Sequence, residues 1–150
     1  MRVKIQIACN KNHSRLPTIA NFKKWIHAIS MQNNKEITIR LVDKNEIQAL
    51  NFCYRGINRP TNILSFPFDK NSNINNFPLL GDIVICSSLL EEEAKKQHKY
   101  LLAHWAHIVI HGILHLLGYN HIHDDEAKQM ELIETKIMLK LGFPDPYLLS

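Results

Sequence analysis

LLAHWAHIVIHGILHLLGYNH, residues 101–121, is the stretch that decides how this chain folds and where its chemistry lies. Apolar residues dominate the run up to Gly118, and a glycine often ends a helix because it adopts a left-handed backbone without strain. We therefore predict one long helix that begins near Leu101 and stops at Gly118. The run also carries four histidines, which would be costly in lipid, so we expect a protein core around it and no membrane span.

The histidines of this run have the spacing of metal ligands. Residues four apart on a helix share a face, so His111 and His115 can hold one ion, and the turn after Gly118 can bring His121 to it. Three neutral nitrogen ligands suit Zn²⁺ in a tetrahedral site and leave a fourth position for water, as in catalytic zinc sites. We predict one Zn²⁺ per chain, bound by His111, His115 and His121.

Other interpretations of the histidines stay open at this point. His123 lies just past the turn and is an alternative third ligand, although His121 follows the turn more directly. Without a metal, the imidazoles would only line a polar helix face. His104 and His107 precede the pair on the same face, where they could support the ligands or relay a proton. For His104 we favour ordinary polar packing.

Gly112 argues against a peptidase. Zinc proteases of the His-Glu-x-x-His type carry their general base directly after the first ligand, where this chain has glycine. A water-activating metal remains, because zinc lowers the pKa of bound water to about 7 without that glutamate. A metal-dependent hydrolase is therefore our hypothesis at this point, with a peptide or amide substrate as an open alternative.

The composition limits the class of protein. A length of 150 residues fits one domain, residues 1–150, with its own core. The net charge of +4 favours anionic partners such as nucleic acid. Three widely spaced cysteines and an N-terminus without an apolar signal-peptide region indicate a reducing compartment, so we expect a cytoplasmic protein.

Periodicity predicts the remaining elements. Alternation or short apolar runs predict four strands, at 3–7, 37–41, 63–66 and 82–86. Helical spacing and end signals predict further helices at 16–31, 43–54, 88–98 and 124–142. The Asn-rich segment 69–77 is expected to be a surface loop. Because strands cluster early and helices late, the pattern predicts an α+β fold.

Two of these helices are expected to begin at capping boxes, Asp43 with Glu46 and Ser88 with Glu91. The acidic run 91–93 is expected where a helix begins, because the helix dipole favours acids there. Asp82 could be a general base, but a strand-end cap is favoured.

Arg55 lies among Lys44, Arg59 and Lys70, between the second and third predicted strands. An arginine beside a metal could clamp a phosphate, although a single one is more often a solvated charge. Trp25 and Trp105 follow helical patterns and are expected in the core.

Several stretches resemble the YbeY endoribonuclease (rRNA maturation factor) family. The histidine signature is residues 111–121, HGILHLLGYNH. The stretches that agree with it in order and spacing are Leu50 and Asn51 with Tyr54 and Arg55, PTNILSFPF at 60–68, Gly81, Asp82 and Ile83, Met130 and Glu131, Glu134, and Pro146 with Tyr147.

The resemblance implies a single-domain α+β fold with a small mixed sheet of about four strands and a zinc site on a helix of the C-terminal half. It implies a single-strand-specific, metal-dependent endoribonuclease of late rRNA maturation, at the 3′ end of the small-subunit RNA, and of ribosome quality control. Its partners would be single-stranded RNA, rRNA and the ribosome or its small subunit. A zinc-stabilised ribosome-assembly or RNA-binding factor without catalysis is the remaining alternative.

Carried over by position, the resemblance makes His111, His115 and His121 the zinc ligands and Arg55 the functional arginine. One position departs from the family pattern: Asn120 stands where an aspartate usually precedes the third histidine. Asparagine keeps the hydrogen-bonding shape but lacks the negative charge. The attacking group, water or the 2′-hydroxyl of the substrate, is not determined by the sequence.

Overall fold

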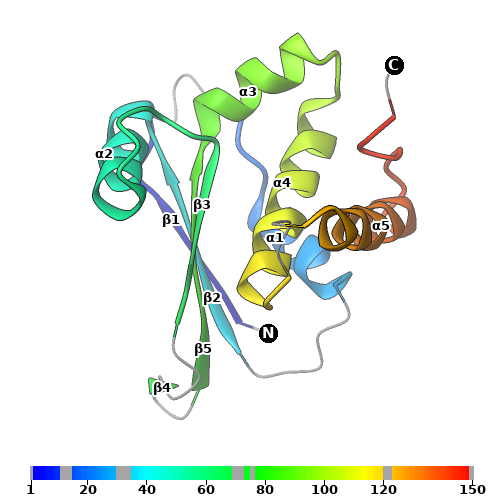
Figure 1. Cartoon of the computed structure of the whole chain (residues 1–150), viewed down its shortest axis with the longest axis horizontal. Helices are drawn as coiled ribbons and strands as arrows, with labels where there is room; N and C mark the ends of the chain where they lie inside the picture. The colour runs from blue at the N-terminus through cyan, green and yellow to red at the C-terminus, as the bar shows by residue number, and fades with distance from the viewer. Residues whose placement is uncertain are drawn as a thin grey trace.

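The computed structural model describes residues 2–10, 15–29, 35–68, 73–74, 77–119 and 123–148. Their elements are β1 (Arg2–Ile7), α1 (Ile19–His27), β2 (Glu36–Val42), α2 (Lys44–Arg55), β3 (Ile63–Pro67), β4 (Asn73–Ile74), β5 (Phe77–Cys86), α3 (Ser87–Lys96), α4 (Leu101–Leu116) and α5 (Asp124–Lys140). Figure 1 shows α2 on one side of the sheet and α1, α4 and α5 on the other. The predicted α+β fold is confirmed.

The sheet is mixed, as the family resemblance implies. Its strands lie in the order β1-β2-β5-β3, with β1, β2 and β5 parallel and β3 antiparallel to β5 at the edge. The short β4 pairs with the first residues of β5. Strand β5 begins at Phe77, earlier than the predicted Asp82, because residues ahead of Asp82 also pair with neighbouring strands.

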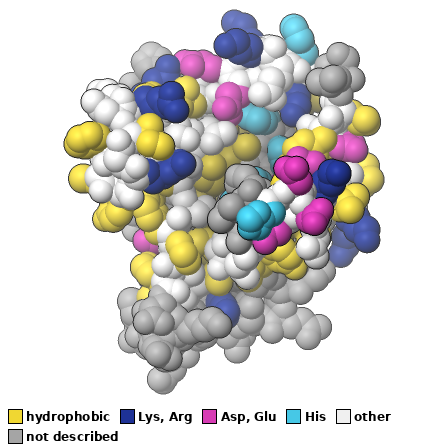
Figure 2. Space-filling view, viewed as in Figure 1, with side chains coloured by type: hydrophobic (Ala, Val, Ile, Leu, Met, Phe, Trp, Pro, Cys, Tyr) yellow, Lys and Arg dark blue, Asp and Glu magenta, His cyan; other side chains and the backbone are white. Residues whose placement is uncertain are grey.

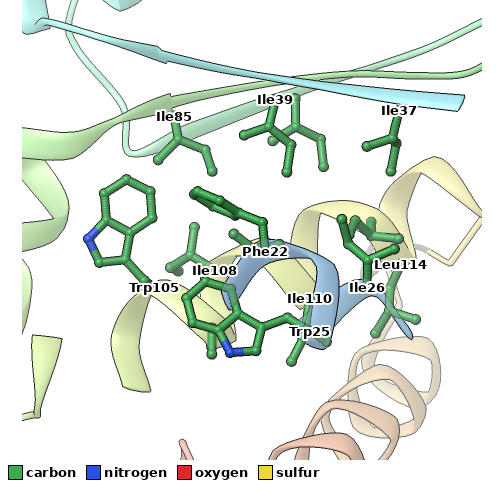
Figure 3. Packing of buried hydrophobic residues seen from close by; sticks show 14 of the residues in the cluster. Phe22, Trp25, Ile26, Ile37, Ile39, Ile85, Trp105, Ile108, Ile110 and Leu114 are labelled. Atoms are coloured by element: carbon green, nitrogen blue, oxygen red, sulfur yellow. The ribbon is translucent and has the colours of Figure 1, made fainter. Parts of the chain in front are cut away.

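Helix α4 lies at the centre of the main core. Twelve of its 16 residues are buried, so the helix is covered on almost every side, as the apolar run predicts. Trp105 packs against Phe22 of α1 with ring centroids 6.1 Å apart, and Phe22 meets Trp25 at 5.5 Å (Figure 3). Both tryptophans are in the core, as predicted. Within the described part of the chain, no helix is long and apolar enough to cross a bilayer.

A smaller core lies on the other face of the sheet, under α2. Ile47 of α2 packs there with Leu64 of β3 and Val84 of β5. Side chains of β3 therefore alternate between the two faces of the sheet. This strand contacts α2 on one face and α4 on the other.

The two predicted capping boxes are wrong, because side chains that would form them make hydrogen bonds to distant residues instead. The Asp43 carboxylate accepts from the backbone N–H of Asn10, 3.3 Å away, and Glu46 binds the Arg40 guanidinium at 2.8 Å. Helix α3 begins at Ser87 without a side-chain cap, and Glu91 accepts from the Arg15 N–H at 2.7 Å.

A capping box does occur at α1, where none was predicted. The Thr18 hydroxyl accepts from the Asn21 N–H at 3.1 Å, and the Asn21 side chain accepts from the Thr18 N–H at 2.9 Å. Helix α1 therefore begins at Ile19, later than the predicted residue 16.

The acidic residues of α3 and β5 also differ from their predicted places. Glu92 and Glu93 lie beyond the first turn of α3, where Glu92 pairs with Lys44 at 2.6 Å and Glu93 with His104 at 2.9 Å. Asp82 lies inside β5 and is no strand-end cap, since it pairs with Thr38 and Phe66. Burial raises the pKa of Asp82, and a hydrogen bond with Thr38 opposes this shift in part.

Gly81 should be a sensitive position of the fold. A Cβ at Gly81 would lie 2.5 Å from the backbone oxygen of Phe66 and 2.7 Å from Leu116 Cδ2, so Gly81→Ala must push β3 and α4 apart. We expect Gly81→Ala to lower the free energy of unfolding by about 3 kcal/mol in urea titrations.

Gly56→Ala is the matched control for this prediction. Gly56 has a left-handed φ of 72°, but a Cβ there would meet nothing within 4 Å, so we expect a loss of about 1 kcal/mol. Equal losses for the two variants would contradict the steric explanation.

Candidate metal centre

The last two turns of α4 carry two histidines on one face, as the spacing predicts. The Nε2 atoms of His111 and His115 lie 3.0 Å apart, and the two rings are nearly perpendicular, at 78°. Two imidazole nitrogens bound to one tetrahedral zinc lie about 3.3 Å apart, given Zn–N distances near 2.05 Å. The two nitrogens therefore lie within about 0.3 Å of the separation that a shared ion requires.

The third predicted ligand lies outside the described residues, and so does Asn120. The turn that leads to them is as predicted: α4 ends at Leu116, and Gly118 has a left-handed φ of 102°. Within the described ranges, no cluster of three or more His, Cys, Asp or Glu side chains has metal-binding geometry. His121 as a ligand stays a prediction. The alternative ligand, His123, is the residue directly before α5.

A buried carboxylate lies behind His111. Glu134 of α5 has a fully buried side chain, and its Oε1 is hydrogen bonded to Nδ1 of His111. Oε2 of Glu134 accepts a hydrogen bond from the Tyr147 hydroxyl and lies 3.3 Å from Nε2 of His107. The same His107 nitrogen is 3.2 Å from the Tyr147 hydroxyl. One carboxylate thus joins α4, α5 and the segment that follows α5.

The charge of Glu134 fixes the tautomer of His111. Burial by itself would raise the pKa of Glu134, but hydrogen bonds from His107, His111 and Tyr147 outweigh it and lower the pKa to about 2. An ionised carboxylate only accepts hydrogen bonds, so Nδ1 of His111 carries the proton and donates it. Nε2 of His111 is then the lone-pair nitrogen, directed toward His115. Metal-binding histidines are commonly held in this way.

Tyr147 acts as a hydrogen-bond donor in this network. Burial raises the pKa of Tyr147, and the hydrogen bond to Glu134 raises it further. The phenol therefore stays protonated over the physiological range and donates to the carboxylate.

His107 and His104 take different roles although both precede the pair on α4. His107 contacts Glu134, which is hydrogen bonded to His111, so His107 has the supporting position that its spacing suggested. His104 instead binds Glu93 of α3 at 2.9 Å, and Asn62 donates to the same carboxylate at 3.2 Å. The favoured interpretation of His104, structural packing, is confirmed.

The histidine pair opens into a pocket of about 630 Å³. Arg55 at the end of α2 lines this pocket together with the edge strand β3 and the end of α4. The structure thus brings Arg55 and both histidines to one cavity, a placement that the sequence alone could not give. On the face shown in Figure 2, Lys and Arg side chains lie over the region of α2, with His side chains toward the middle.

Gly112 faces the sheet and not the cavity. A Cβ at this position would lie 2.6 Å from Ile63 Cδ1, and the backbone oxygen of Gly112 accepts from the Ser65 hydroxyl at 3.3 Å. The missing side chain lets α4 approach β3 closely. The close approach leaves no room for a side chain at position 112 without displacement of Ile63.

The sequence-based reasoning did not identify the role of Glu134, which it named only through the family resemblance. A signal was present: Met130, Glu134, Ile137 and Met138 form the buried stripe of α5, at helical spacing. A carboxylate within an apolar stripe requires buried partners, and histidines are the natural donors.

Comparisons with known proteins agree with these findings. Residues 6–142 match the model of the family described as endoribonuclease YbeY, and the chain belongs to this family. The fold is similar to the solution structure of TM1509 from Thermotoga maritima, with a TM-score of 0.57 and 26% sequence identity over 96% of this chain and 99% of that chain. The family resemblance drawn from the motifs is thereby confirmed.

Removal of the Glu134 charge should weaken metal binding. Glu134→Gln can donate to His111 through its amide and so no longer fixes the proton on Nδ1, and we expect Zn²⁺ affinity to fall about 10–100-fold in a chelator competition titration.

Glu131→Gln removes an exposed carboxylate of the same helix and should leave the affinity unchanged. An unchanged affinity for a folded Glu134→Gln variant would show that the carboxylate does not orient the ligand.

Proposed function

We propose that this chain is a single-strand-specific, zinc-dependent endoribonuclease of late rRNA maturation, acting at the 3′ end of the small-subunit RNA and in ribosome quality control in the cytoplasm. Residues 1–150 would form its one catalytic domain. The observation that carries the proposal is the shared cavity: a histidine pair of metal-binding separation lies beside an arginine in a member of an endoribonuclease family.

His111, His115 and His121 would hold one Zn²⁺ per chain. When bound, the ion supplies a Lewis acid that lowers the pKa of water and neutralises charge on a phosphodiester. Glu134 holds a proton of His111 on Nδ1, so Nε2 is the nitrogen left to bind the ion. Tyr147 and His107 hold Glu134 in turn, so the orientation of the ligand depends on three further side chains.

Arg55 would bind the phosphate to be cleaved. Its guanidinium is always charged and can donate two parallel hydrogen bonds to phosphate oxygens, which stabilises charge that develops there. Arg55 is exposed at the end of α2, where Gly56 ends the helix with a left-handed φ. No buried acid is available to hold its side chain among the described residues that line the pocket, so it can turn to the substrate.

The lining of the cavity includes backbone and side chains of an edge strand. Thr61, Asn62 and residues of β3 line it together with His111 and His115. A single strand can splay its backbone along such a cavity, whereas the grooves of an RNA duplex hide its bases. The net charge of +4 also favours an anionic chain as substrate.

Metal removal tests the proposal. Protein purified without added metal and loaded with one equivalent of Zn²⁺ should cleave a labelled unpaired RNA, lose cleavage in chelator, and regain it when Zn²⁺ returns. His115→Ala should lose both bound zinc and cleavage. Persistent cleavage after complete removal of zinc would refute zinc dependence, and wild-type protein that binds zinc but never cleaves RNA would support a non-catalytic assembly factor.

Arg55→Ala separates phosphate binding from metal binding. We expect this variant to keep its zinc while its kcat/KM on unpaired RNA falls about 10²–10³-fold, the usual cost of removing one charge-stabilising donor. Full activity of Arg55→Ala would remove Arg55 from the mechanism.

A further inference from the structure

Two aromatic rings, one exposed (Tyr54) and one partly buried (Phe66), lie next to residues of the Arg55 pocket. Tyr54 of α2 and Phe66 of β3 pack edge to face, with ring centroids 5.0 Å apart and planes at 61°. Tyr54 directly precedes Arg55, and Phe66 lies between Ser65 and Pro67, two residues that line the pocket. Tyr54 and Phe66 therefore neighbour residues that line the proposed substrate cavity, while the ring of Phe66 packs on the α2 side of the sheet.

The exposure of Tyr54 is not explained by packing. Its side chain is 68% exposed although its ring is held by Phe66. An exposed aromatic ring beside a basic residue is the combination with which proteins bind single-stranded nucleic acid. On the face shown in Figure 2, hydrophobic and basic side chains lie next to one another in the region of α2.

We propose that Tyr54, fixed by Phe66, is a stacking platform for one unpaired base of the RNA whose phosphate Arg55 binds. Proteins that bind single strands combine basic groups for the backbone with aromatic faces for the bases. Arg55 supplies the first feature and the ring of Tyr54 the second, in adjacent positions of one helix. Contact with Phe66 fixes the ring before the base arrives, so little conformational freedom is lost on binding.

The inference rests on the proposed function and adds a specific contact to it. Stacking requires an unpaired base, because a base within a duplex already has neighbours on both faces. The platform would therefore contribute to the preference for single strands. Because Tyr54 is outside the histidine pair and its Glu134 support, it would act on binding and not on the metal.

The test measures binding of zinc-loaded protein to an unpaired 2′-O-methyl phosphorothioate RNA, which resists cleavage, by fluorescence anisotropy. We expect Tyr54→Ala to weaken binding about 5- to 150-fold, the measured range for loss of one stacked base, and Tyr54→Trp to bind at least as well as wild type. Tyr100→Ala is the matched control, since Tyr100 is 83% exposed at the start of α4 and outside the pocket. It should bind as wild type does.

A set of RNAs with one abasic position each identifies stacking itself. At one position the missing base should weaken binding to wild type by the same factor as Tyr54→Ala, and it should have no further effect on the variant. If the variant and wild type respond equally to every abasic position, the platform is refuted.

The failure of this inference is distinguishable from failure of the proposed function. Wild-type protein that cleaves unpaired RNA while Tyr54→Ala binds and cleaves equally well overturns the platform alone. Wild-type protein that neither binds nor cleaves unpaired RNA overturns both.

Discussion

The buried carboxylate of Glu134 is the group on which the arrangement of the site depends. A carboxylate without solvent is stable only when donors satisfy it, and here the donors come from two residues of α4 and from Tyr147, beyond α5. The network therefore binds the C-terminal segment, α5 and α4 together. The same hydrogen bond that satisfies the charge also selects the tautomer of His111, so one contact contributes to folding and orients this imidazole.

The second constraint is the close approach of α4 to the edge of the sheet. Gly112 permits the helix to lie against Ile63 and Ser65 of β3, and α2 lies on the other face of the same strand. Arg55 at the end of α2 and the histidine pair of α4 line one cavity together with residues of this strand. The short edge strand therefore forms part of the cavity lining between the two helices.

Local sequence patterns predicted the structure correctly where the residues of one helix or strand determine it. The apolar run and Gly118 predicted the buried α4 and its end, alternation predicted the strands, and the spacing of His111 and His115 predicted the shared face. The patterns failed where a distant residue competes. Glu46 and Glu91 have capping spacing, but Arg40 and the backbone of Arg15 take their carboxylates. The position of Arg55 in the cavity and the buried partners of Glu134 also depend on tertiary contacts that no local pattern encodes.

The central claim is that His111 and His115 bind one zinc between their Nε2 atoms. Diffraction at the zinc absorption edge, from crystals of protein purified without added metal and then given one equivalent of Zn²⁺, tests it most directly. We expect a single anomalous peak about 2.0–2.1 Å from Nε2 of both residues, with a third nitrogen ligand from His121. A peak elsewhere, or imidazoles that share no ion, would contradict the claim.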